Sequence, residues 1–170
     1  KPSFLGTKVF YDYPLENLLE RIDWTPFFRS WQLAGKFPKI LKDEVVGETA
    51  TKLYQDAQAM LKTIIDEKWL TARAVIGFYP ANSVSDDIEV YSDEQRDNTA
   101  YKLHHLRQQK QTRNGKFNHC LSDFIAPKET QLNDYIGGFA VTAGIGIDEH
   151  VERFEKNHDD YNSILLKSLA

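Results

Sequence analysis

The strongest constraint on the fold is a helical pattern of apolar residues between Glu48 and Trp69. Apolar side chains recur there at spacings of three and four residues, the repeat of one face of an α-helix. The stripe consists of Ala50, Leu53, Tyr54, Ala57, Met60, Leu61, Ile64 and Ile65. A helix with one apolar face needs another layer to cover that face. We therefore expect a long helix over Glu48–Trp69 that packs on the rest of the chain.

Beyond this helix the pattern changes to that of β-strands. Some segments are continuously apolar or alternate between apolar and polar residues, and others are rich in strand formers between turn residues. The period of residues 101–109 is ambiguous, and residues 110–118, KQTRNGKFN, are predicted to form a flexible loop. The four predicted strands, in one antiparallel sheet, are Ala74–Pro80, Asp87–Tyr91, Cys120–Ala126 and Tyr135–Thr142.

Shorter helical patterns precede the long one. The segment LENLLERI follows Pro14, a residue favoured in the first turn of a helix. A second helical segment over Thr25–Leu33 has Pro26 near its start and an aromatic face. The chain is thus predicted to begin with helices, continue with strands and end with a helix, which is the order of an α+β domain. We predict an α+β fold with helices flanking a bent antiparallel sheet.

The last predicted helix runs from Asp148, a plausible N-cap, to Ala170 without a stop signal. We therefore expect residues 1–170 to be one domain portion that is truncated within this helix. The helix would then leave an apolar face exposed or covered by another chain, and that face contains Phe154, Leu165, Leu166 and Leu169.

Composition narrows the functional classes. Of the 170 residues, 41 % are hydrophobic and 27 % charged, which suits one soluble domain. The net charge of -4 and the mixing of basic with acidic residues argue against nucleic acid as a partner. No apolar run is long enough to cross a membrane, and the start lacks a signal-peptide pattern. With Cys120 as its single cysteine, the chain has no disulfide framework, and we predict a cytoplasmic protein.

The residues that most resemble metal ligands or catalytic groups have unsuitable spacing. His104 with His105, and His119 with Cys120, are adjacent pairs, which would point to opposite faces of a strand. We therefore predict no metal site, and an inert thiol that behaves as a small hydrophobe. The carboxylate pairs Asp86-Asp87 and Asp159-Asp160 are expected to be turn and helix-surface residues. No glycine-rich nucleotide-binding motif is present.

One aspartate is harder to assign. In the segment IDWTPFFRSW, Asp23 stands beside Trp24 and close to further aromatic residues. It lies two residues before the position of an ideal cap for a helix that starts at Pro26, and Thr25 can take that role. A carboxylate beside aromatic rings could instead bind a cationic ligand. From the residues alone, both interpretations stay open.

Seven segments, in order along the whole chain, together resemble the activation domain of cobalamin-dependent methionine synthase. They are IDWTPFFRSWQLAGKFPKIL, GETATKLYQDAQAMLKTI, RAVIGFYPANSVSDDIEVY, LRQQ, CLSDFIAP, DYIGGFAVTAG and HDDYNSILLKSLA. The family domain continues beyond the last of these segments, and its later arginine and glutamate ligand groups have no counterpart here. The resemblance implies that the aspartate at position 23 contacts S-adenosylmethionine.

The resemblance also implies a chemical role within a methyltransferase. In the family, cobalamin that has been oxidised is restored by an electron from flavodoxin or a flavoprotein reductase and a methyl group from S-adenosylmethionine. Cobalamin is bound by a neighbouring module of the same polypeptide, and zinc belongs to another module of the full-length enzyme. This role needs placement of the methyl donor and no acid or base residue. Because the ligand pocket of the family is incomplete in this portion, the fragment alone is expected to be inactive. The alternative is a structural or interaction module that binds no small molecule.

Overall fold

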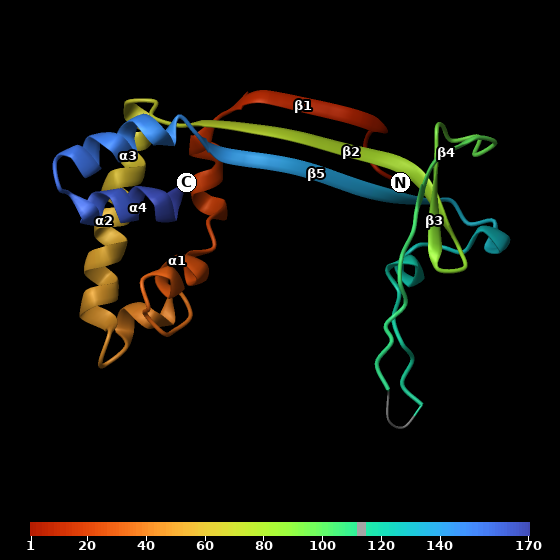
Figure 1. The fold of residues 1–170 in the computed structure, drawn as a ribbon, viewed down its shortest axis with the longest axis horizontal. Coiled ribbons are helices and arrows are strands. Elements are labelled where there is room, and N and C mark those ends of the chain that lie inside the picture. The colour runs from red at the N-terminus through yellow and green to blue at the C-terminus, as the bar shows by residue number, and fades with distance from the viewer. Residues whose placement is uncertain (112–114) are drawn as a thin grey trace. The chain divides into compact units, whose positions relative to one another are not determined.

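In the computed structural model, which describes residues 1–111 and 115–170, the chain folds into helices and strands in the order of an α+β protein (Figure 1). The strands are β1 (Gly6–Tyr13), β2 (Thr71–Val84), β3 (Asp87–Tyr91), β4 (Thr99–Leu103) and β5 (Asp134–Ile145). The helices are α1 (Trp24–Ser30), α2 (Gly47–Asp66), α3 (Ile147–Lys156) and α4 (Asp160–Leu169). Short 3₁₀ helices cover Leu15–Arg21, Lys39–Lys42, Leu121–Phe124 and Lys128–Thr130.

The strands form one sheet in the order β1-β2-β3-β4, and β5 also pairs with β2. Figure 1 shows β1 and β5 on opposite sides of β2. The β2–β3 hairpin is antiparallel and pairs Ala81 with Val90. It turns at Ser85, which has a positive φ of 57°. The β3–β4 pair is antiparallel too, with a register shift between Val90 and Tyr91. The predicted α+β class is confirmed.

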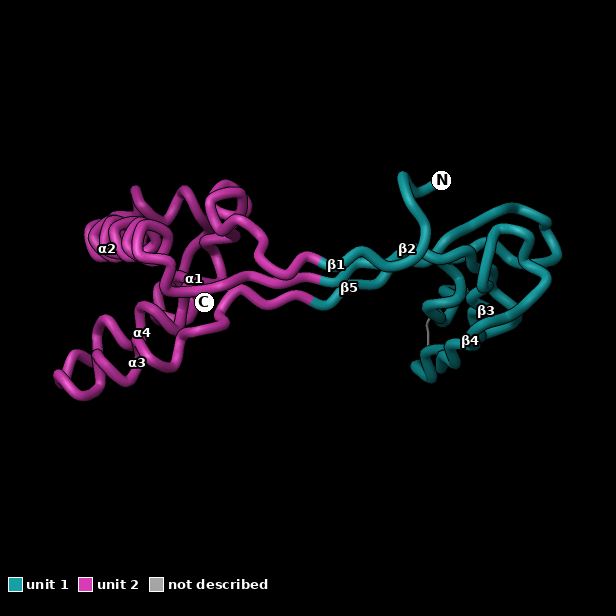
Figure 2. Tube along the Cα trace, turned by 90° about the horizontal axis from the view of Figure 1, so that it is seen from above, with its two compact units in different colours: residues 1–9, 75–140 teal, residues 10–74, 141–170 magenta. Residues whose placement is uncertain are grey.

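The chain divides into two compact units (Figure 2). Unit 1 comprises Lys1–Val9 and Val75–Ala140, and unit 2 comprises Phe10–Ala74 and Val141–Ala170. Each unit has its own apolar cluster. In unit 1 this cluster is small, with Ala81, Ile88 and Val90 as its buried members.

Unit 2 holds the larger core, which is built on the helical stripe of α2. The stripe buries Ala50, Leu53, Ala57, Met60, Leu61 and Ile64. Aromatic residues of α1 and Leu165 and Leu166 of α4 cover it. The predicted long helix is therefore confirmed, with its end at Asp66. Lys68, just beyond that end, has a left-handed φ of 56°, so the chain leaves the helix there.

The prediction of a strand over Cys120–Ala126 is wrong. The chain forms a 3₁₀ helix over Leu121–Phe124 instead, with Cys120 at its N-cap. The Asp123 carboxylate accepts the Cys120 backbone N–H at 2.9 Å, a local bond that competes with a strand ladder. Leu121 and Phe124 are exposed. Their side chains therefore bury no apolar surface that would stabilise an extended strand.

The prediction of one helix from Asp148 to Ala170 is also wrong. The segment forms α3 and α4, which are separated by a turn in which His158 has a φ of 56°. The N-cap position of α3 is Gly146, which has a φ of 101°. A Cβ there would lie 2.7 Å from the Trp69 carbonyl oxygen, so a side chain is excluded. Asp148 lies in the first turn, where its charge still suits the helix dipole.

The apolar face predicted for this segment is largely covered by the chain itself. Leu165 and Leu166 are buried, and Phe154 and Leu169 are half-buried against the same core. The prediction that these four residues form an exposed face is therefore wrong. The neighbours that cover these residues come from α1 and α2.

Some elements had no clear sequence signal. Strand β1 was not predicted, and the ambiguous segment 101–109 begins with the end of β4. The segment LENLLERI is a 3₁₀ helix over Leu15–Arg21. Of the predicted loop 110–118, residues 112–114 lie outside the described residues. Within the described part of the chain, no helix has the length and apolar character that crossing a membrane requires.

Candidate functional site

Asp23 is the N-cap of α1. Its Oδ1 accepts the Thr25 backbone N–H at 3.0 Å, and its backbone is extended, as expected for a cap. The prediction that Asp23 lies too early to cap, and that Thr25 takes this role, is wrong. The helix begins at Trp24, which makes Pro26 the third helical residue. A proline is tolerated there because the first turn has no intrahelical partner for its N–H groups.

The aromatic residues beside Asp23 belong to the core of unit 2. Trp24 is buried, with its ring centroid 4.8 Å from that of Tyr54 and 5.2 Å from that of Phe27. Phe28 is stacked on Phe37 at 6.2 Å. This cluster anchors the start of α1 rigidly, so the position of the adjacent carboxylate is well defined.

The carboxylate of Asp23 is only partly used by the cap. The residue is exposed, and within residues 1–111 and 115–170 its Oδ2 has no hydrogen bond or ion pair. A charged oxygen on a rigid base, open to solvent, can accept a hydrogen bond from a cationic ligand. Asp23 is thus both a structural cap and an available ligand group.

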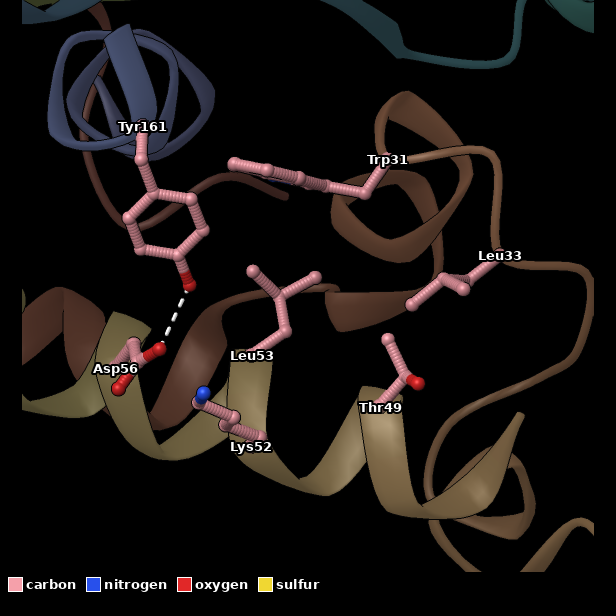
Figure 3. A pocket seen from close by; sticks show the side chains of 7 residues that line it. All are labelled: Trp31, Leu33, Thr49, Lys52, Leu53, Asp56 and Tyr161. Atoms are coloured by element: carbon pink, nitrogen blue, oxygen red, sulfur yellow. Dashed lines mark hydrogen bonds between the residues drawn. The ribbon is translucent and has the colours of Figure 1, made fainter. Parts of the chain in front are cut away.

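A cavity of about 430 Å³ lies in the same unit, between α1, α2 and α4 (Figure 3). Its apolar walls are Trp31, Leu33 and Leu53, and its polar lining residues are Thr49, Lys52, Asp56 and Tyr161. Thr49, Lys52 and Asp56 share one face of α2 because they recur at helical spacing. Asp23 is not among the residues that line this cavity.

Tyr161 and Asp56 form the main polar contact in this cavity. The Tyr161 hydroxyl donates to Asp56 Oδ2 at 2.7 Å (Figure 3). Burial, together with the hydrogen bond to the Asp56 carboxylate, raises the pKa of Tyr161 to about 12. The Tyr161 ring also lies 5.4 Å from the Trp31 ring, at a tilt of 59°. The pair ties α4 to α2, a contact across 105 residues of sequence that no local pattern signals.

The histidines and the cysteine singled out from the sequence are not brought together as a ligand set. His104 Nδ1 lies 3.1 Å from Asp87 Oδ1, and His105 is half-buried. Cys120 is buried, and its thiol lies 3.5 Å from the Asp86 carbonyl oxygen. Within the described ranges, no three histidine, cysteine or acidic residues are grouped as metal ligands. The absence of a metal stays a prediction, which metal analysis of the purified protein would check.

Asp86 belongs to an ion cluster around Arg107 that the sequence did not reveal. The guanidinium of Arg107 donates to Asp86 Oδ1 and to both oxygens of Asp123, at 2.7 to 3.0 Å. It also donates to the Asn118 carbonyl oxygen. The hydrogen bonds from Arg107, followed by that from the Cys120 N–H, lower the pKa of Asp123 to about 2. This cluster fastens the segment 118–123 to the β2–β3 turn.

The paired carboxylates have the structural roles expected of them. Asp86 and Asp87 are each engaged by a cationic or imidazole side chain. Asp159 caps α4 by accepting the Asn162 N–H at 3.1 Å, and Asp160 lies in the first turn. Neither pair has the free, converging geometry that acid–base catalysis requires.

Comparison with known proteins shows similarity both to a protein family and to a solved structure. Residues 14–170 match the family described as vitamin B12 dependent methionine synthase, activation domain. The fold is also similar to a crystal structure of the MetH reactivation domain bound to AdoHcy, with a TM-score of 0.90 and 50% sequence identity. That match covers 99% of this chain and 51% of the other chain. The chain thus spans about half the length of the solved structure it resembles.

Proposed function

The chain belongs to the family of vitamin B12 dependent methionine synthase activation domains, and from this premise we propose that it binds S-adenosylmethionine for cobalamin reactivation. Methionine synthase is a methyltransferase. The matched crystal structure is of a reactivation domain bound to AdoHcy. AdoHcy is what remains of S-adenosylmethionine once its methyl group has been transferred. At 50% identity over nearly the whole chain, the same ligand chemistry is the best-supported function.

The observation that carries the proposal is the state of Asp23. One carboxylate oxygen holds the start of α1, and the other is open to solvent at the end of a rigid aromatic cluster. The amino-acid end of S-adenosylmethionine carries an ammonium group, and an exposed carboxylate is a suitable acceptor for it. The residues of this chain therefore fit the polar end of the ligand.

In this role the chain binds and orients without donating or removing protons. Bound S-adenosylmethionine supplies an electrophilic methyl group, for which reduced cobalamin is the acceptor. Asp23 holds the opposite end of the ligand, and the core behind Trp24 keeps that carboxylate in place. Asp86, Asp87 and Asp159 are engaged in structural contacts, which is consistent with a placement role.

The partners follow from the same proposal. Cobalamin would be held by a neighbouring module of the same polypeptide, and the electron would come from flavodoxin or a flavoprotein reductase. Zinc would be confined to another module. We propose that the 170-residue chain by itself catalyses no methyl transfer, because neither cobalamin nor an electron donor is part of it.

Calorimetric titration of S-adenosylmethionine into the complete domain, which includes the arginine and glutamate ligand groups of the family, tests the proposal. Asp23→Asn removes the charge but keeps the cap, because asparagine caps helices as well as aspartate does. A lost hydrogen bond to a charged group costs about 1.5–3 kcal/mol, so the dissociation constant should rise roughly 10- to 150-fold. The melting temperature should barely change.

Asp159→Asn is the matched control, since it makes the same substitution at the N-cap of α4. It should leave the affinity unchanged. No heat of binding with the unmodified complete domain would favour the alternative function, an interaction module without a small-molecule ligand. Equal affinities of the Asp23→Asn variant and the unmodified chain would show that Asp23 is only a cap.

A further inference from the structure

Helix α2 carries one aromatic residue, Tyr54, and its ring packs against the start of α1. The Tyr54 ring centroid lies 4.8 Å from that of Trp24, and the two ring planes make an angle of 80°. This edge-to-face arrangement is one that aromatic pairs prefer. Trp24 is buried and follows Asp23 directly in the sequence. The contact therefore joins the residue next to the Asp23 cap to a helix outside α1.

Tyr54 is the nearest ring to Trp24 that does not belong to α1. Two other rings lie near Trp24: Phe27 is part of α1 itself, and Phe37 is farther away, at 6.4 Å. The Tyr54 ring in turn lies 5.3 Å from Phe37 and 6.5 Å from the fully buried Phe28. Within the described residues its hydroxyl makes no hydrogen bond, so Tyr54 acts through the packing of its ring.

The direction of the Asp23 carboxylate depends on this packing. Helix α1 has 7 residues, and helices shorter than about 12 residues are marginal without tertiary contacts. Within the described residues, the Asp23 carboxylate has one hydrogen bond, from the Thr25 N–H at 3.0 Å. That bond lies within the start of α1 and cannot orient it relative to the rest of unit 2. The orientation must come from the buried neighbour Trp24, which Tyr54 holds.

We propose that Tyr54 is a positioning residue for the S-adenosylmethionine site, which acts through Trp24 on the Asp23 carboxylate and does not touch the ligand. This inference rests on the proposed function of Asp23. An acceptor that is already oriented binds more tightly than one that the ligand has to order, because ordering costs free energy on binding. Removal of the Tyr54 ring should therefore weaken binding, and only as long as residue 23 carries its charge.

A double-mutant cycle in the complete domain tests this coupling by calorimetric titration with S-adenosylmethionine. Tyr54→Leu removes the ring contact and should raise the dissociation constant about two- to tenfold, the range expected from one aromatic pair. Tyr54→Phe keeps the ring and should restore the affinity. In a domain that already carries Asp23→Asn, Tyr54→Leu should no longer change the dissociation constant.

Phe154→Leu is the matched control, because it removes a half-buried ring of the same unit whose aromatic neighbour is Trp69. It should lower the melting temperature but leave the affinity unchanged. A second readout needs no ligand. Backbone order parameters from NMR are about 0.85 for rigid residues and below about 0.6 for flexible ones. Tyr54→Leu should lower the values of Asp23 and Trp24 in the ligand-free domain, and Phe154→Leu should not.

Several outcomes would overturn the proposal. Equal effects of Tyr54→Leu with aspartate and with asparagine at position 23 would show that Tyr54 acts independently of Asp23. An unchanged affinity in Tyr54→Leu, an equal loss in Phe154→Leu, or unchanged order parameters at Asp23 would also contradict it. Absence of binding to the unmodified complete domain would instead refute the proposed function, and the order parameters would still decide whether Tyr54 positions Asp23.

Discussion

Asp23 caps α1, and we propose that the same side chain also contacts the ligand. One oxygen of its carboxylate satisfies a backbone N–H at the start of α1, and the other is open to solvent. Sequence reasoning placed the helix start two residues too late and so left the charge without a structural role. The two tasks can be separated, since capping needs an acceptor atom and ligand binding needs a charge.

Stability should respond to the cap alone. Asp23→Ala removes the acceptor and should lower the free energy of unfolding by about 1 kcal/mol, the usual cost of a lost N-cap. Asp23→Asn should lower it far less. Urea unfolding of both variants measures this difference, with unchanged slopes of the transition as a check. Equal losses in the two variants would mean that the charge itself stabilises the fold.

Tyr161 should titrate at unusually high pH. Its pKa is raised from 10 to about 12 by burial and by Asp56. Its stabilising contribution is therefore complete below pH 10 and is lost as the pH rises towards 12, because the unfolded chain ionises first. The titration of Tyr161 is isolated by following absorbance against pH in the unmodified chain and in Tyr161→Phe and taking the difference. Asp56→Asn should move that midpoint down, and a midpoint near pH 10 in the unmodified chain would contradict the contact.

Among the elements, the segment from Asn118 to Asp123 depends most on a single side chain. Arg107 holds it through two carboxylates and a carbonyl oxygen, and the short helix Leu121–Phe124 follows from the Asp123 cap. Strand propensity in CLSDFIAP is outweighed by these bonds. The planar guanidinium is suited to this geometry, because it presents several donors in a fixed arrangement.

Arg107→Lys should therefore weaken the cluster while keeping its charge. The pKa of Asp123, about 2 in the unmodified chain, should rise towards its ordinary value of 3.8. The contribution of Asp123 to stability is present above pH 3.8 and is lost as the pH falls towards 2. Carboxyl titration by NMR measures the shift. Asp43 is the control, since backbone N–H groups of Val46 and Val45 lower its pKa and Arg107 does not contact it. An unchanged Asp123 would contradict the cluster.

For the molecule as a whole, the two units differ in the size of their cores. The core of unit 2 joins residues of α1, α2 and α4, whereas the buried apolar cluster of unit 1 has three members. Hydrophobic burial is the main favourable contribution to folding, and it is roughly proportional to the apolar area removed from water. Unit 1 also relies on polar anchors, among them Asn82, whose amide donates to the carbonyl oxygens of Ala126 and Leu132.

Hydrogen exchange should therefore find unit 1 opening at lower free energy than unit 2. Amides of β3 should exchange faster than those in the middle of α2. Leu166→Ala, at a fully buried position of α4, should cost about 2–5 kcal/mol and should reduce protection throughout unit 2. The exposed Ile164 of the same helix provides the control substitution. Equal protection of both units would indicate a single cooperative structure.

The sequence by itself determined the α+β class, the long helix α2, strand β3, parts of β2 and β5, and the family. These features depend on local periodicity and on residue identity, which are independent of where the chain lies in space. Tertiary structure alone decided the pairing of Tyr161 with Asp56 and the cluster around Arg107, whereas local bonds decided the turn at Cys120 and the break between α3 and α4. Each of these depends on a partner distant in the sequence or on a local bond that competes with propensity. The free energy of such contacts is gained only when the fold brings the groups together.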